Sequence, residues 1–176
     1  MKKYIKLLRI EQWIKNIFVF LPLFFSGAFL HLELFSVSLF AFFIFSFTAS
    51  CIYIINDYTD IEADKKHPEK RKRPLASGEI SKSAAKLVFA GLVFLIIFLT
   101  SLVGFLFSID LLYFCLVISA YFIMNIAYTF RLKHIAIVDI SIIALGFVFR
   151  VLAGGYITGI WISQWAILLT FVLALV

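Results

Sequence analysis

Long apolar runs occupy most of this chain, and short polar segments separate them. The runs cover residues 16–30, 34–55, 84–107, 111–130, 135–157 and 161–176. A helix rises about 1.5 Å per residue, so about 20 apolar residues cross the hydrocarbon core of a bilayer. The pattern therefore predicts an all-α, multi-spanning transmembrane helical bundle with six spans. The first run is short, and we expect its helix to begin earlier, with Trp13 at the membrane interface.

The amino-acid composition excludes an ordinary water-soluble domain. Of the 176 residues, 64% are hydrophobic and 22 are Phe, whereas soluble domains are about 45–50% apolar. In a soluble protein the net charge of +6 would suggest a nucleic-acid partner. In a membrane protein the same charge reflects orientation against anionic lipid, so we expect membrane lipid and no nucleic acid among the partners.

Lys and Arg gather on alternate connections between the runs. The N-terminal segment carries five: Lys2, Lys3, Lys6, Arg9 and Lys15. The long polar loop and the start of the third run carry eight: Lys65, Lys66, Lys70, Arg71, Lys72, Arg73, Lys82 and Lys86. The connection at 131–134 carries two, and those at 31–33, 108–110 and 158–161 carry none. The positive-inside rule then predicts that the N-terminus and the polar loop, residues 56–83, are both cytoplasmic. We expect the membrane to be the bacterial cytoplasmic membrane.

The last apolar run reaches residue 176 without a polar flank, although spanning helices generally emerge into one. We therefore expect the sequence to be part of a longer protein. Residues 1–176 form one transmembrane domain in this interpretation, with the loop at 56–83 inside it.

Three aspartates in the loop share one predicted helical face. Asp57, Asp60 and Asp64 have the spacing i, i+3, i+7, which places them within roughly 60° of arc on a helix extending the second run. Glu62 points well away from that arc. Carboxylates so placed repel each other unless a cation lies among them, and such hard oxygen ligands suit Mg²⁺ together with substrate phosphates. We therefore predict a magnesium site on these aspartates, where Asn56 adds an amide oxygen or orients a carboxylate; a solvated loop is the alternative.

A dense basic run follows the aspartates in the same loop. Its members are Lys70, Arg71, Lys72 and Arg73. Because Arg and Lys bind phosphate oxygens well, carboxylates for a metal beside bases for phosphate suggest that the loop handles a diphosphate. For this run, too, the alternative is a solvated loop that merely obeys the positive-inside rule.

Two further groups lie near the same face of the predicted membrane protein. Lys15 and Asn16 open the first run, where the alternative to a binding role is an interfacial anchor. Tyr128, Lys133 and His134 bracket the loop after the fourth run. Tyr and Lys could meet phosphate there, and a place in the interfacial aromatic belt is the alternative for Tyr128.

Asp139 and Arg150 lie within the fifth apolar run, where ionisable residues are costly and usually face a cavity or a partner. They are eleven residues apart, which puts them on one helical face but about 16 Å apart. Each therefore needs a partner other than the opposite charge, or an aqueous pocket. We predict a functional cavity, with a purely structural polar network as the alternative. Gly154, Gly155 and Gly159 offer a small-residue surface, in which Gly155 and Gly159 form a GxxxG pattern typical of close helix packing.

The stretch NDYTDIEAD at 56–64 resembles the first aspartate-rich motif, NDxxDxxxD, of the UbiA superfamily of intramembrane prenyltransferases. Further stretches resemble its decaprenyl-phosphate phosphoribosyltransferase branch: EQWIKN (11–16), HPEKRKRPLASGEIS (67–81), YTFRLKHIAIVDI (128–140) and RVLAGG (150–155). The similarity extends from about residue 8 to residue 176.

The resemblance implies an all-helical bundle of about nine spans around a central cavity that opens to lipid. It also implies Mg²⁺ held by two aspartate-rich motifs, with diphosphate as the leaving group. The positions that match family motifs are Asn56, Asp57, Asp60 and Asp64 in the first motif, Tyr128 and Lys133 in the phosphate-contacting region, and Lys15 with Asn16 near the start. No second aspartate-rich motif occurs before residue 176, so we expect it in sequence beyond this chain.

The predicted reaction is a Mg²⁺-dependent transfer of a 5-phosphoribosyl group from phosphoribosyl diphosphate to a polyprenyl phosphate. The predicted catalytic residues are Asp57, Asp60, Asp64 and Lys133, and the predicted substrate-binding residues are Lys15, Asn16, Asn56, Lys70, Arg71, Arg73, Tyr128, Asp139 and Arg150. The first alternative is a prenyltransferase that moves an isoprenoid from its diphosphate to an aromatic acceptor with the same aspartates. A transporter or lipid-binding subunit is an alternative from another class.

Overall fold

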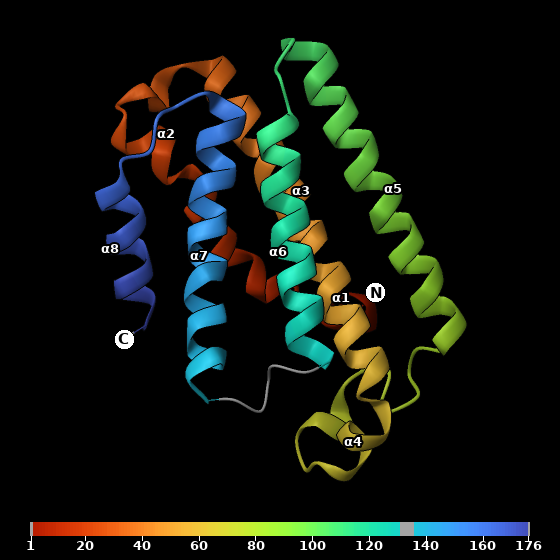
Figure 1. Ribbon diagram of the computed structural model, residues 1–176. Coiled ribbons are helices and arrows are strands. Elements are labelled where there is room, and N and C mark those ends of the chain that lie inside the picture. Colours follow the sequence, from red (N-terminus) through yellow and green to blue (C-terminus); the bar gives the residue numbers. More distant parts are fainter. Residues whose placement is uncertain (1, 131–135, 176) are drawn as a thin grey trace.

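The computed structural model describes residues 2–130 and 136–175, and these form helices joined by turns (Figure 1). Four helices are long and apolar enough to cross a membrane: α3 Leu32–Thr59, α5 Lys82–Phe107, α6 Leu112–Phe130 and α7 Ala136–Thr158. They coincide with the second to fifth predicted spans. The predicted all-α membrane bundle is therefore confirmed, and the chain is an integral, multi-pass membrane protein.

Helix α3 lies at the centre of this bundle. Its apolar side chains Ile44 and Phe45 are fully buried, and they belong to a core that also contains Val19, Phe114 and Ile157 from other elements. Helix α5 is the opposite case, because few of its side chains are buried and it packs mainly against α3. Exposed apolar side chains are expected where a helix faces lipid rather than water.

The first predicted span, 16–30, is not one helix. The chain instead forms a 3₁₀ segment, η1 Ile10–Phe20, then the short helix α2 Leu21–Phe25, and then the 3₁₀ turn η2 Ala28–Leu30. Gly27 interrupts the path with a positive φ of 72°, a conformation that glycine adopts readily. A 3₁₀ helix rises about 2.0 Å per residue, so η1 covers about 22 Å without being an α-helix.

Side-chain contacts explain why η1 runs beside α3. The indole N–H of Trp13 donates to Ser50 Oγ at 3.1 Å, and Asn16 Nδ2 donates to Ser46 Oγ at 2.9 Å. Further along, the ring of Phe20 contacts phenylalanine rings of α3. Residue numbers rise along η1 as they fall along α3, so the two elements are antiparallel. The helical segment of the first run begins at Ile10, earlier than residue 16, as expected.

The last predicted span, 161–176, corresponds to the shorter helix α8, Gln164–Leu175, of 12 residues. The hydroxyl of Ser163 accepts a hydrogen bond from the N–H of Ala166 at 3.1 Å and caps the start of this helix. Four of the six predicted spans are thus long helices in the part of the chain that the structure describes. The first is broken and the last is short.

The basic segments gather at one end of the bundle (Figure 1). Helix α1 Lys2–Leu8 lies there with α4 Ile61–Lys66 and the 3₁₀ turn η3 Lys70–Lys72. Lys3 Nζ donates to the carbonyl of Glu79 at 3.2 Å and ties the N-terminal helix to the long loop. The predicted topology requires this common end; the side of the membrane that it faces stays a prediction.

Gly154 brings α7 against η1. A Cβ atom at this position would overlap the carbonyl oxygen of Val19, so no larger residue fits without movement of the backbone. Gly159, by contrast, follows the end of α7 and has a φ of 68°. The predicted GxxxG pattern is therefore not a continuous helical face, because Gly159 lies beyond α7. Gly154, which belongs to the same predicted small-residue surface, makes the close contact with η1, and Gly155 lies against the side chain of Ile162.

Candidate functional site

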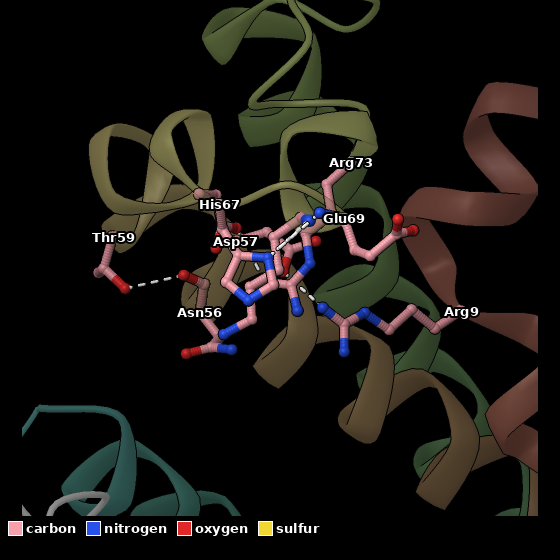
Figure 2. A network of polar contacts seen from close by, with 9 residues as sticks. Arg9, Asn56, Asp57, Thr59, His67, Glu69 and Arg73 are labelled. Carbon is pink, nitrogen blue, oxygen red and sulfur yellow. Dashed lines mark hydrogen bonds and ion pairs between the residues drawn. The ribbon is translucent and has the colours of Figure 1, made fainter.

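Asp57 and Asp64 form a buried acidic pair at the end of α3. Their side chains are 2% and 4% exposed. Arg73 Nη1 lies 3.2 Å from Asp57 Oδ1 and 2.8 Å from Asp64 Oδ2. Both carboxylates therefore converge on one guanidinium nitrogen. Figure 2 shows Arg73 beside Asp57.

The local backbone corrects the geometry predicted for the aspartates. Helix α3 ends at Thr59, and Asp60 lies at the junction with α4, with φ −95° and ψ 10°. The three aspartates thus do not lie along one continuous helix. The turn brings Asp57 and Asp64 together and leaves Asp60 half-buried at the corner.

The described residues contain no group of three His, Cys, Asp or Glu side chains arranged to hold a metal ion. Within this part of the chain the acidic ligands that converge are two, Asp57 and Asp64. Asn56 lies beside them; its backbone carbonyl accepts a hydrogen bond from Thr59 Oγ1 at 2.9 Å (Figure 2). The metal-ligand roles of Asp57, Asp60 and Asp64 stay predictions.

Buried residues just after Arg73 fix its position. Arg73 is extended, as a residue before proline usually is. Pro74 and Leu75 are buried, and Leu75 packs with Ile54 and Ile61 of α3 and α4. The loop is therefore anchored where it returns to the membrane, and the Arg73 side chain is directed at the acids.

The rest of the predicted basic run is placed differently. Lys70 and Arg71 are exposed, and Lys72 makes a surface ion pair with Glu69 at 3.2 Å. Among these residues only Arg73 contacts the buried acids in the structure. The phosphate-binding roles of Lys70 and Arg71 stay predictions.

Arg9 is a member of the site that sequence reasoning missed. Its Nη2 lies 2.6 Å from Asp57 Oδ1 (Figure 2). Its guanidinium lies 4.6 Å from the centre of the Tyr53 ring. Arg9 has φ 50° and ψ 49°, a left-handed conformation that is uncommon outside glycine. In the sequence Arg9 counted only toward topology. Its place four residues before Trp13, at the start of the apolar segment, is the one signal that could have singled it out.

A cavity of about 140 Å³ lies between η1, α3, α6 and α7. Its lining contains three of the predicted binding residues, Lys15, Tyr128 and Arg150. Its polar lining also contains Tyr53, Tyr121 and Asn125, which the sequence did not single out. Tyr53 contacts Arg9 as well, so this residue joins the cavity to the aspartate site.

Arg150 is buried and held by neutral groups. Its Nε donates to Asn16 Oδ1 and its Nη1 donates to the Gly146 carbonyl, each at 2.7 Å. The guanidinium also lies over the rings of Phe45, Tyr121 and Phe147. None of the partners that the described residues give Arg150 is a carboxylate. Its charge is thus oriented but not neutralised, which suits a bound anion.

Asp139 has a partner of its own. The hydroxyl of Tyr128 donates to Asp139 Oδ1 at 2.6 Å. The prediction that Asp139 and Arg150 need separate partners is confirmed. The predicted residues Lys133 and His134 lie outside the described residues.

The UbiA prenyltransferase family model matches residues 17–176. The chain belongs to this family. Among curated UbiA relatives, decaprenyl-phosphate phosphoribosyltransferase of Corynebacterium glutamicum is 38% identical over 167 residues, covering 93% of this chain and 48% of that protein. The enzyme of the same name from Mycobacterium tuberculosis is 37% identical over 170 residues, covering 94% of this chain and 54% of that protein. The chain thus spans about half the length of these relatives.

Solved UbiA structures have the same fold. A UbiA homologue from Archaeoglobus fulgidus bound to DMAPP and Mg²⁺ superposes with a TM-score of 0.74 at 23% identity, over 98% of this chain and 60% of that one. A digeranylgeranylglyceryl phosphate synthase gives a TM-score of 0.72 at 25% identity, over 99% of this chain and 58% of that one. The family resemblance seen in the sequence is confirmed.

Proposed function

We propose that this protein transfers a 5-phosphoribosyl group from phosphoribosyl diphosphate to a polyprenyl phosphate, at the cytoplasmic face of a bacterial membrane. The similarity to decaprenyl-phosphate phosphoribosyltransferases supports the reaction class. The observation that carries the proposal is the pairing of two sites through Tyr53. One holds buried carboxylates, and the other is a cavity lined by Lys15 and Arg150.

The acidic pair fits Mg²⁺ by its chemistry. Asp57 and Asp64 offer hard carboxylate oxygens that already converge on one cationic nitrogen. Mg²⁺ sites commonly use one or two protein carboxylates and take further oxygens from substrate phosphates and water. When bound, the ion neutralises charge that develops on the diphosphate leaving group. Within the described residues Asp60 does not form a three-ligand group with this pair, so its metal-ligand role rests on the sequence motif alone.

The polar cavity supports phosphoribosyl diphosphate, rather than a simple isoprenyl diphosphate, as the proposed donor. Phosphoribosyl diphosphate carries a phosphate on C5 as well as the diphosphate on C1, so it needs two separated cationic or metal sites. Lys15 and Arg150 would bind the C5 phosphate, and the hydroxyls of Tyr53 and Tyr128 would bind ribose or phosphate oxygens. An isoprenyl diphosphate would need only one anion site and an apolar channel.

The bonds change as follows in the proposed reaction. An oxygen of the lipid phosphate forms a bond to ribose C1, while the bond from C1 to the diphosphate oxygen breaks. Diphosphate leaves with the electron pair, and the product is a polyprenyl-phosphoryl 5-phosphoribose. Arg9 and Arg73 lie beside the acidic pair and would contact the departing diphosphate.

The test uses membranes that carry the complete reading frame, radiolabelled phosphoribosyl diphosphate, a polyprenyl phosphate and Mg²⁺. We expect label in the lipid phase with Mg²⁺ and none with EDTA. Asp57→Asn should lower turnover by at least about a hundredfold, because loss of a charge-stabilising group commonly costs this much. Glu62→Gln is the matched control, since Glu62 is an exposed acid of the same loop that pairs with Lys65. Equal turnover in the Asp57 and Glu62 variants would refute the proposed role of the acidic pair.

The second candidate is prenyl transfer to an aromatic acceptor, which family membership and the DMAPP-bound homologue support. The same membranes would then prenylate a quinone-type aromatic and ignore phosphoribosyl diphosphate. This candidate would be excluded if label from phosphoribosyl diphosphate entered the lipid phase and the quinone-type aromatic was not prenylated.

A further inference from the structure

The acidic pair and its two arginines form a compact cluster with no net formal charge. Arg9 contacts Asp57, and Arg73 contacts both Asp57 and Asp64 (Figure 2). The side chains come from three segments that are distant in sequence: the N-terminus, the α3–α4 turn and the basic loop. Arg73 therefore fills the place between the two carboxylates where a metal ion would bind, and Arg9 occupies the same Asp57 oxygen.

The acidic and basic side chains of this cluster differ in how freely they can move. The Asp57 and Asp64 side chains are almost fully buried, whereas those of Arg9 and Arg73 are 22% and 25% exposed. Arginine also has a long stem, so its guanidinium can swing to a new partner while its backbone stays in place. Only the bases can move away from these contacts without unfolding the end of α3.

Charge limits what can be added to the cluster. A divalent ion bound beside both guanidiniums would give the cluster two excess positive charges at short range. The ion must therefore displace the arginines from the carboxylates. Displaced guanidiniums need an anion, and a diphosphate offers oxygens in the fork geometry that arginine prefers.

We propose that Arg9 and Arg73 are stand-in cations, which occupy the metal position and move to the diphosphate when metal and donor bind. This inference rests on the proposed function, because it takes its diphosphate from that reaction. The arginines are positioning residues in two states: they hold the acids in place in the free protein, and they bind the leaving group in the loaded one. Metal and donor then favour each other's binding. The metal frees the arginines from the carboxylates, and the diphosphate of the donor gives the freed arginines a new partner.

The decisive measurement is the affinity of the purified full-length protein for Mn²⁺ alone, from the electron paramagnetic resonance signal of the free ion. Arg73→Gln removes the cation shared by both acids, so we expect Mn²⁺ to bind at least about tenfold more tightly. Arg9→Gln removes a cation that contacts Asp57 but not Asp64, and about threefold tighter binding is expected. Lys72→Gln is the control for charge alone, since it removes an exposed cation from the adjacent position. Its Mn²⁺ affinity should change by less than about twofold.

The second measurement is binding of labelled phosphoribosyl diphosphate at saturating Mg²⁺. We expect both arginine variants to bind this donor at least about tenfold more weakly than the wild type. Opposite effects on metal and donor identify the exchange, because a merely structural arginine would weaken both. Arg73→Gln with Asp64→Asn should lose the gain in Mn²⁺ affinity, which locates the metal at the acidic pair.

A folding control keeps the test decisive if Arg73→Gln is unstable. In that case Mn²⁺ should raise its Tm by more than it raises the wild-type Tm, since a ligand that binds the folded state stabilises it. Arg73→Lys, which keeps the charge, should restore weak Mn²⁺ binding. Unchanged or weaker Mn²⁺ binding in folded Arg73→Gln would overturn the inference. If the wild type bound no ribosyl donor while the Mn²⁺ gain persisted, the proposed function would fail and the displacement of arginine by metal would stand.

Discussion

Arg73 faces two buried carboxylates, whereas Arg150 faces only amide, carbonyl and aromatic groups within the described residues. The first arginine lies on a loop and is partly exposed; the second is buried in a spanning helix and fixed by several contacts. At Arg73 the negative charge is the buried, fixed component and the cation can be exchanged. At Arg150 the positive charge is fixed, and only an anion can neutralise it.

This contrast fits a donor with two anionic ends. The acidic pair would receive the end that brings a metal ion, and the Arg150 cavity would receive a bare phosphate. Tyr53 lies at both, so a single small substrate could extend from one to the other.

Removal of the Arg150 charge should have the largest effect. Arg150→Met keeps an apolar stem of similar length, and we expect affinity for the ribosyl donor to fall by about a hundredfold, because truncation of a buried, hydrogen-bonded charge is costly. Donor KM and kcat, measured separately, check this. Lys66→Gln, an exposed cation of the loop, is the control. Wild-type donor affinity in Arg150→Met would leave the cavity as a structural polar network.

A change in the packing of η1 should affect both arginine sites together, since η1 carries Asn16 and begins directly after Arg9. Gly154→Ala places a methyl group against the Val19 carbonyl, and we expect a loss of about 1–3 kcal/mol of stability. The Tm in detergent and both ligand affinities would report it. Gly91→Ala is the matched control, because nothing lies within 4 Å of a Cβ at this helical position. If the two alanine variants were equally stable, the close contact would not constrain the fold.

Loss of the Tyr128 hydroxyl should lower turnover without removing the charge of Arg73 or of Arg150. Tyr128→Phe deletes the hydrogen bond to Asp139, and about a tenfold fall in turnover is expected, as for a lost hydrogen bond to a charged group. The variant should keep its Mn²⁺ affinity, because Tyr128 lies in the cavity and not at the acidic pair. A changed Mn²⁺ affinity would contradict the separation of the two sites.

The surface pair Glu62–Lys65 should have the smallest effect. The hydrogen bond and charge of Lys65 hold the pKa of Glu62 below its usual range. A depressed folded-state pKa favours folding above the titration range of the free carboxyl, and the benefit is lost as pH falls through the folded value. Lys65→Gln should return the pKa toward its usual range in an NMR titration of Glu62, with no change in turnover. A loss of turnover would extend the functional site to this exposed face.

The site was only partly accessible from the sequence. Asp57, Asp64 and Arg73 were identified because they occupy one short polar loop between long apolar runs, where their chemistry is conspicuous. Lys15, Tyr128 and Arg150 were candidates too, although nothing local indicated that they line one cavity. Arg9 was missed because its partner Asp57 is 48 residues away and belongs to another helix.

The sequence by itself determined the membrane class, the four long helices and the gathering of basic segments at one end. Each depends on local composition, because an apolar run long enough to cross a bilayer must satisfy its own backbone as a helix. Only the tertiary structure decided the broken path of residues 10–30, the turn at Asp60 and the partners of the buried charges. Arg150 meets Asn16 across 134 residues of sequence. Such a contact depends on which helices pack together, and no local pattern of polar and apolar residues encodes that choice.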